Sequence, residues 1–192
     1  MVKKIIINNK EEYNNFLNKI FFYKYYKFTN FEVKSKIKSN DLDIIVKTLN
    51  IKNKKKRLTY LYDEIIKYLD AYYPKSICDF KNNQCFVQRK RNDNAKFGCC
   101  IKCHRVKPNI GCPTFNSSCK LLYCKPALEK IKKLKISDIP ITRCLSIFQK
   151  FLLKFNFYST REQIINDLRF GIIYWYIRNI PKSIKLSLNM KA

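Results

Sequence analysis

Glycine is scarce in this sequence, with three residues among 192. A chain with so few glycines is poorly suited to folds that depend on many tight turns, because glycine is the residue that adopts positive φ angles without strain. Neither a G-x-G-x-x-G pattern nor a G-K-[ST] step is present. The sequence therefore lacks the loops that cradle phosphates in nucleotide-binding folds.

Long apolar runs are also missing. The best candidate for a membrane span, residues 164–180, is interrupted by Asn166, Asp167, Arg169 and Arg178, so we expect no transmembrane helix. The N-terminus has only three consecutive apolar residues after its lysines, too few for a signal peptide. We therefore expect a cytoplasmic protein in a reducing compartment, where dense cysteines bind metal more often than they form disulfides.

Acidic residues are few, because Lys and Arg outnumber Asp and Glu by 40 to 14 and give a net charge of +26. The excess is spread evenly, at +9 for residues 1–75, +8 for residues 76–125 and +9 for residues 126–192. Such a charge attracts polyanions, and nucleic acid is one partner that it favours. The alternative is a compositional bias toward Lys, Asn, Ile and Tyr, as an AT-rich genome would produce.

Hydrophobic residues make up 46% of the chain, enough for a folded core. Residues 3–7 predict a short edge strand, and Asn9 with Glu12 resembles the capping box that begins a helix. A helix is expected from Asp41 to Leu49. The clearest one runs from Lys56 to Tyr73, before Pro74.

The C-terminal part also reads as helical. An apolar stripe extends from Cys144 to Phe155, which makes Cys144 a buried thiol rather than a ligand. The residues around Thr160 and Gln163 form a second capping signal before an apolar stripe over residues 164–176. We predict a mainly α fold with three parts: helical residues 1–75, an irregular cysteine-rich lobe at 76–125, and helical residues 126–192 packed against the first part.

Cysteine is concentrated in the central part. Eight of the nine cysteines lie within 47 residues, at positions Cys78, Cys85, Cys99, Cys100, Cys103, Cys112, Cys119 and Cys124. Thiolates bind zinc and iron well, and the binding energy would fold a segment that has few aliphatic residues of its own. The pair Cys100 and Cys103 forms a CxxC, in which both sulfurs reach one tetrahedral ion. We predict that all eight are metal ligands.

Eight ligands divide into two sets of four. One division pairs Cys78 and Cys85 with Cys100 and Cys103, and leaves the other four for a second site; exchanging Cys99 for Cys100 is equally consistent. Two zinc ions are the default for closed four-cysteine sites, and a [4Fe–4S] cluster is the alternative. His104, the single histidine, could replace a thiolate, although a lone surface histidine is the commoner case. Buried or disulfide-bonded cysteines are the remaining alternative.

The order Cys99-Cys100, Gly111-Cys112 and Cys119-Lys-Leu-Leu-Tyr-Cys124 resembles the bacterial family of zinc- or iron-chelating cysteine-cluster proteins. The resemblance is confined to residues 78–124 and implies metal chelation. The family's C-x-x-C-G-x-C-C opening is absent here, so the resemblance implies no one-to-one assignment of ligands.

Three functions follow from these observations. The first is a metal-stabilised module that contacts nucleic acid through basic residues around the presumed metal sites: Arg89, Lys90, Arg91, Lys96, Lys102, Arg105 and Lys107. The second is an iron–sulfur redox protein or enzyme, although acids for general acid–base chemistry are scarce in the lobe. The third is a zinc-stabilised structural module that binds a protein partner.

Overall fold

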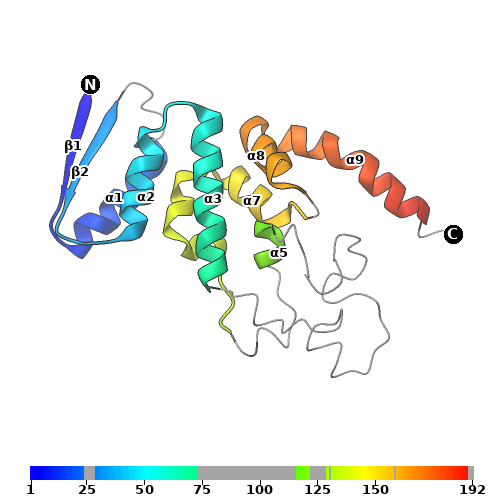
Figure 1. Ribbon diagram of the computed structural model, residues 1–192, viewed down its shortest axis with the longest axis horizontal. Coiled ribbons are helices and arrows are strands. Elements are labelled where there is room, and N and C mark those ends of the chain that lie inside the picture. The colour runs from blue at the N-terminus through cyan, green and yellow to red at the C-terminus, as the bar shows by residue number, and fades with distance from the viewer. Residues whose placement is uncertain (24–28, 73–115, 122–128, 130, 158, 190–192) are drawn as a thin grey trace.

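The computed structural model describes residues 1–23, 29–72, 116–121, 129, 131–157 and 159–189, and side chains only as far as residue 180. Within these ranges the protein is mainly helical, with one short two-stranded parallel sheet (Figure 1). The predicted α class is confirmed at this level. The part of the cysteine-rich segment before residue 116 lies outside the described residues.

The chain begins with a β–α–β unit. Strand β1 (Val2–Ile7), helix α1 (Lys10–Tyr23) and strand β2 (Asn30–Ser35) follow one another, and the strands pair in parallel from Val2↔Asn30 to Ile7↔Ser35. The predicted first strand is confirmed. The second was not predicted, because its short alternation of polar and apolar residues stands beside an aromatic–basic run that obscures it.

The expected capping signal at the start of α1 is present in modified form. The Asn9 side chain accepts a hydrogen bond from the Glu12 backbone N–H at 2.9 Å. The Glu12 carboxylate in turn accepts from the N–H of Asn8, one residue earlier than in a capping box, at 2.6 Å. Both side chains satisfy backbone donors that the first helical turn leaves unpaired.

Helices α2 (Asn40–Asn50) and α3 (Lys54–Tyr72) confirm the two helices predicted in this region. Helix α3 runs through the middle of the molecule (Figure 1), and its buried side chains are Leu58, Leu61, Tyr62, Ile65 and Leu69. These follow the apolar spacing that the sequence predicted.

The chain returns to the first part through two short 3₁₀ helices, η2 (Ile136–Asp138) and η3 (Pro140–Cys144). Helix η3 contacts α1, α2 and α3, and Ile139 and Ile141 beside and within it are completely buried. The C-terminal part thus completes the hydrophobic core of the N-terminal part. Cys144 is buried, as expected.

Helix α7 (Ile147–Phe155) confirms the predicted helix but not a buried stripe. Its buried side chains are Leu152 and Leu153, whereas Ile147, Phe148, Phe151 and Phe155 are exposed. The helix is apolar on more than one side, and periodicity cannot tell which side the neighbouring elements cover. Packing against α5 (Ser117–Leu121) and α8 (Arg161–Phe170) selects the leucines.

The predicted stripe over residues 164–176 belongs to two helices. Helix α8 begins with a capping box between Thr160 and Gln163, as expected, and packs across α3. It ends at Gly171, whose φ of +97° and ψ of −173° are compatible with glycine almost alone. Helix α9 (Ile172–Asn189) therefore starts in a new direction and extends away from the body toward the C-terminus (Figure 1).

No helix among the described residues is long and apolar enough to cross a membrane.

Candidate functional site: the anchored end of the cysteine-rich segment

The described residues of the cysteine-rich segment, Asn116 to Leu121, are packed into the helical body. Asn116, Ser117, Ser118 and Lys120 are each at most 2% exposed, although all four side chains are polar. Polar groups are buried at this level only when hydrogen bonds replace their contacts with water. The partners of these side chains therefore define how the segment is attached.

Two serines attach the segment to α7. The hydroxyls of Ser117 and Ser118 both donate hydrogen bonds to the backbone carbonyl of Leu153, at 3.0 and 2.8 Å. Leu153 lies in the last turn of α7, where helix carbonyls have no partner within the helix. The two hydroxyls supply that partner inside the protein.

Asn116 extends the attachment to the turn between α7 and α8. Its amide nitrogen donates to the carbonyls of Asn156 and Ser159, at 3.1 and 3.0 Å. Its amide oxygen accepts the backbone N–H of Cys119 at 3.0 Å, in the manner of a helix N-cap. One side chain thus binds the α7–α8 turn and begins the short helix α5.

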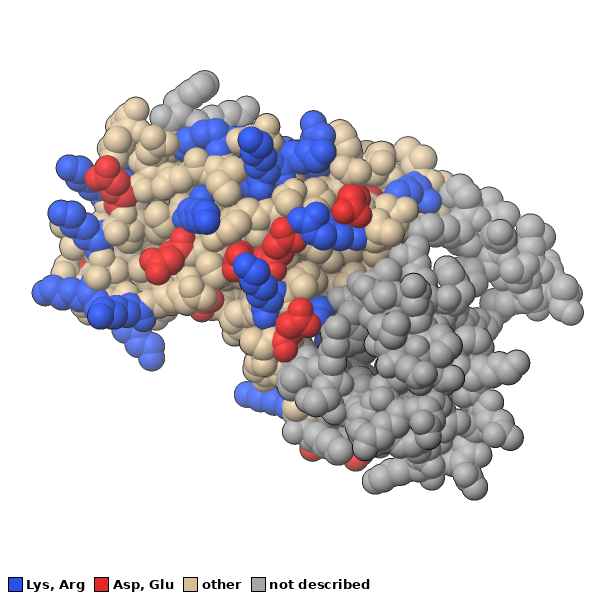
Figure 2. Space-filling model, viewed as in Figure 1, with Lys and Arg blue, Asp and Glu red and all other residues tan. Residues whose placement is uncertain are grey.

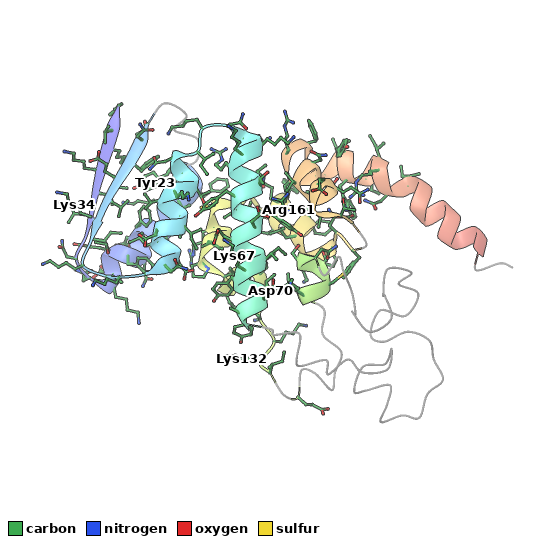
Figure 3. The ribbon with its side chains drawn as sticks, in the orientation of Figure 1. Tyr23, Lys34, Lys67, Asp70, Lys132 and Arg161 are labelled. Carbon is green, nitrogen blue, oxygen red and sulfur yellow. The ribbon has the colours of Figure 1, made fainter. Side chains whose placement is uncertain are left out.

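The third attachment is an ion pair between Lys120 of α5 and Asp70 of α3. The lysine side chain is 2% exposed and the aspartate 46% exposed. Figure 3 shows Asp70 near the end of α3 that lies beside α5. A buried ammonium is stable only with such a partner, because desolvation of an unpaired charge costs several kcal/mol.

Tyr62 of α3 closes the same cluster. It is buried, and desolvation raises the pKa of its hydroxyl to about 12, against an opposing effect of hydrogen bonding with Ser117. These contacts therefore join α3, α5 and α7 through polar groups that are buried, apart from the half-exposed carboxylate of Asp70. We call the set Asn116, Ser117, Ser118 and Lys120 the polar anchor.

The polar anchor determines the position of Cys119. This cysteine is half-buried on α5, and its backbone N–H is bound by Asn116. It is the one predicted metal ligand among the described residues. The other seven lie outside them, as do His104 and all seven basic residues predicted to contact nucleic acid. The described residues therefore do not test whether these cysteines form common metal sites.

Within the described ranges, no three His, Cys, Asp or Glu side chains come together in a way that could hold a metal ion. Cys144 is buried in the core at η3, which agrees with its expected role as a structural thiol.

Sequence reasoning did not find the polar anchor. The run Asn116-Ser-Ser-Cys-Lys120 has the composition of an exposed loop. The available signal was the helix-capping potential of Asn116 in front of three residues able to continue a helix. Nothing in the sequence indicated that the hydroxyls would meet the carbonyl of Leu153.

A second buried polar network lies near the start of α9. Arg178 donates from Nε to Asp167 at 3.1 Å and forms an ion pair with it, and it also donates to Asn156 at 3.1 Å and to Ser159 at 3.0 Å. Asp167 is completely buried. Asn156 and Ser159 also provide carbonyls to Asn116, so the α7–α8 turn connects this network to the polar anchor.

An open pocket of about 670 Å³ lies where β2 leads into α2, lined among others by Ser35, Lys38 and Asp43. Helix α2 carries Asp41 and Asp43 in its first turn, and burial raises the pKa of Asp41. These carboxylates already occupy the end of the helix that would attract an anion. The pocket therefore offers no clear chemistry for a phosphate ligand.

Basic residues are distributed over the surface. Figure 2 shows Lys and Arg side chains along the edge formed by β1, β2 and α1, with Asp and Glu interspersed. Among the exposed lysines of this edge are Lys4, Lys34, Lys36 and Lys38.

Comparison with known proteins found no matching family model, curated protein or solved structure.

Proposed function

We propose that this protein binds metal through its cysteine-rich segment, with Cys78, Cys85, Cys99, Cys100, Cys103, Cys112, Cys119 and Cys124 as ligands. The observation that carries the proposal is the density of eight cysteines in 47 residues. Two zinc ions are the first choice, because zinc prefers closed sites with four thiolates. A [4Fe–4S] cluster is the alternative cofactor, and it would make the protein a redox carrier or an enzyme.

The polar anchor supports this proposal in one respect. It fixes the backbone on both sides of Cys119 to α3 and α7 through buried hydrogen bonds and an ion pair. A ligand on a rigid support loses less conformational freedom when a metal binds. Metal bound at Cys119 would accordingly stabilise the helical body as well as the cysteine-rich segment.

The proposal is tested by metal content per chain, measured by elemental analysis and visible absorbance on protein purified without oxygen. Two zinc ions and no colour would support structural zinc sites. Iron with an equal amount of sulfide and a brown colour would support a cluster. Protein that holds no metal under these conditions would refute metal binding.

Three cysteine variants locate the sites. Cys103→Ser and Cys119→Ser should each lower the metal content, because each removes a ligand. Cys144→Ser is the matched control, since Cys144 is buried in η3 and is predicted to be a structural thiol, so the metal content of this variant should remain that of the wild type. A loss of metal in the control would mean that Cys144 belongs to a site.

Contact with nucleic acid is a second candidate function, favoured by the net charge of +26 and by the exposed lysines at and after β2. Counterion release makes such binding weaken steeply as salt increases. Replacing Lys34, Lys36 and Lys38 with Gln should lower both the affinity and its salt dependence for single-stranded or duplex DNA and RNA. Absence of salt-dependent binding in the wild type would remove this candidate and leave a structural, partner-binding role for the metal-bound module.

A further inference from the structure

Helix α9 presents an apolar stripe to the solvent. Ile173 is 73% exposed, Tyr176 is 63% exposed and Ile177 is 61% exposed. Residues three and four positions apart share one face of a helix, so these side chains form a continuous surface. Phe170, at the end of α8, is 55% exposed and its ring lies 5.1 Å from that of Tyr174, which extends the apolar area to the beginning of α9.

The outward direction of this stripe is fixed by the opposite face of α9. There the ring of Trp175 meets that of Phe151 edge to face at 6.0 Å, and Arg178 is bound to the buried carboxylate of Asp167. These inward contacts lie within the same helical turns as Ile173 and Ile177. The helix cannot turn its stripe toward the protein without breaking a buried ion pair, which costs several kcal/mol.

The charge of this region selects the chemistry of the partner. From Leu168 to Ala192 the sequence has five basic residues and no acidic one. Arg169 is exposed, with its guanidinium 4.8 Å from the centre of the Phe170 ring. The apolar stripe therefore lies in a segment whose sequence has basic and no acidic residues, on a helix that extends away from the helical body (Figure 1).

We propose that α9 docks on an anionic lipid surface. Ile173, Tyr176 and Ile177 enter the boundary between headgroups and acyl chains, and the positive charges of Arg169, Lys182, Lys185 and Lys191 attract the anionic headgroups. An amphipathic helix with aromatic and aliphatic residues on one side and cations nearby lies in the membrane interface by these two contributions. The helix lies on the bilayer and does not span it.

Two other occupants fit the stripe less well. A second copy of the chain would bring two molecules of charge +26 together, and like charges oppose that association. Single-stranded nucleic acid matches the charge, but it binds by stacking bases on aromatic rings. Isoleucine side chains such as Ile173 and Ile177 offer no stacking surface.

The test is co-sedimentation of the full chain with vesicles of phosphatidylcholine alone and of phosphatidylcholine mixed with phosphatidylserine. The variant is Ile173→Ser/Ile177→Ser, and the single variant Ile173→Ser provides a smaller change. The control is Ile6→Ser on β1, because Ile6 is 65% exposed and lies at the other end of the fold. All replaced side chains are well exposed, so circular dichroism should match that of the wild type.

The proposal expects the wild type to bind vesicles that contain phosphatidylserine and to bind pure phosphatidylcholine much more weakly. The double variant should lower the bound fraction by about fivefold or more, with the single variant in between and the Ile6→Ser control unchanged. Lack of binding to both vesicles would overturn the proposal. So would binding that the double variant leaves unchanged, since charge alone would then explain it.

A second copy of the chain and a nucleic acid, as alternative occupants of the stripe, would each give a different experimental result. If the wild type sediments as a dimer that the double variant dissociates, without vesicle binding, the stripe is an interface between copies. If the double variant loses affinity for an oligonucleotide but vesicles are never bound, the stripe serves nucleic acid. Either result would refute docking on lipid, and neither depends on whether the cysteines bind metal.

Discussion

Lys120 of the cysteine-rich segment and Asp70 of α3 form an ion pair in which the lysine is almost fully buried and the aspartate nearly half exposed. The two residues are separated by the whole stretch of chain that contains seven of the eight clustered cysteines. The pair therefore holds the end of the segment near the point where the segment leaves α3. It is one of three attachments of that end to the helical body, beside the hydrogen bonds of Asn116 and of the two serines.

Replacing Asp70 with Ala should destabilise the protein by about 2 kcal/mol, because the almost fully buried ammonium of Lys120 would lose its ion pair with this carboxylate. The expected loss of stability is moderate because the Asp70 carboxylate is partly solvated. Urea unfolding at neutral pH measures the change. The matched control is Glu64→Ala, which removes the pair with Lys67 on the same helix; that lysine is 71% exposed, so the loss of stability should be clearly smaller. Equal effects of the two variants would show that burial of Lys120 is unimportant.

The two Arg–Asp ion pairs that involve α8 should also contribute unequally to the free energy of unfolding, according to their burial. Asp167 is completely buried beneath Arg178, so Asp167→Ala should cost about 3 kcal/mol or more. Arg161, labelled in Figure 3, makes two hydrogen bonds of 2.7 and 2.6 Å with Asp63, but both side chains are more than one third exposed. Asp63→Ala should then cost less than about 1 kcal/mol. Thermal unfolding of both variants gives the comparison, and a larger loss in Asp63→Ala would contradict it.

Tyr62 should make stability depend on alkaline pH. Its pKa is about 12 in the folded protein and about 10 in an unfolded chain. The folded state then holds its proton more tightly, so its contribution is complete below pH 10 and is lost as the pH rises from 10 to 12. The free energy of unfolding should fall by about 2 kcal/mol more in the wild type than in Tyr62→Phe across this window. If the free energy of unfolding fell equally with pH in both proteins, the raised pKa of Tyr62 would be contradicted.

Gly171→Ala should destabilise the protein by about 2 kcal/mol through the backbone alone. The φ and ψ angles of Gly171 lie in a region that residues with a Cβ rarely adopt, whereas an added Cβ would meet no atom within 4 Å. Calorimetry of this variant, with the exposed Ile173→Ala on the adjoining helix as control, measures the effect. A neutral result for Gly171→Ala would mean that the break between α8 and α9 carries no strain.

The sequence by itself determined the positions of several helices in the described regions. Apolar spacing located α2, α3 and α7, and capping residues located the starts of α1 and α8, because these signals act between residues a few positions apart. Composition likewise indicated a basic chain with clustered cysteines. The metal sites remain a prediction from that clustering.

The tertiary structure decided which surfaces are buried. The sequence could not show that Leu153, rather than Phe151, is the side chain of α7 that faces the protein core. Nor could it show that polar side chains such as Ser117 and Lys120 are buried while Ile173 is exposed. Burial depends on which distant element covers a helix face, and several faces of this chain are apolar enough to be covered. A polar side chain can be buried only where distant partners such as Leu153 and Asp70 meet it, and those meetings arise only when the helices pack.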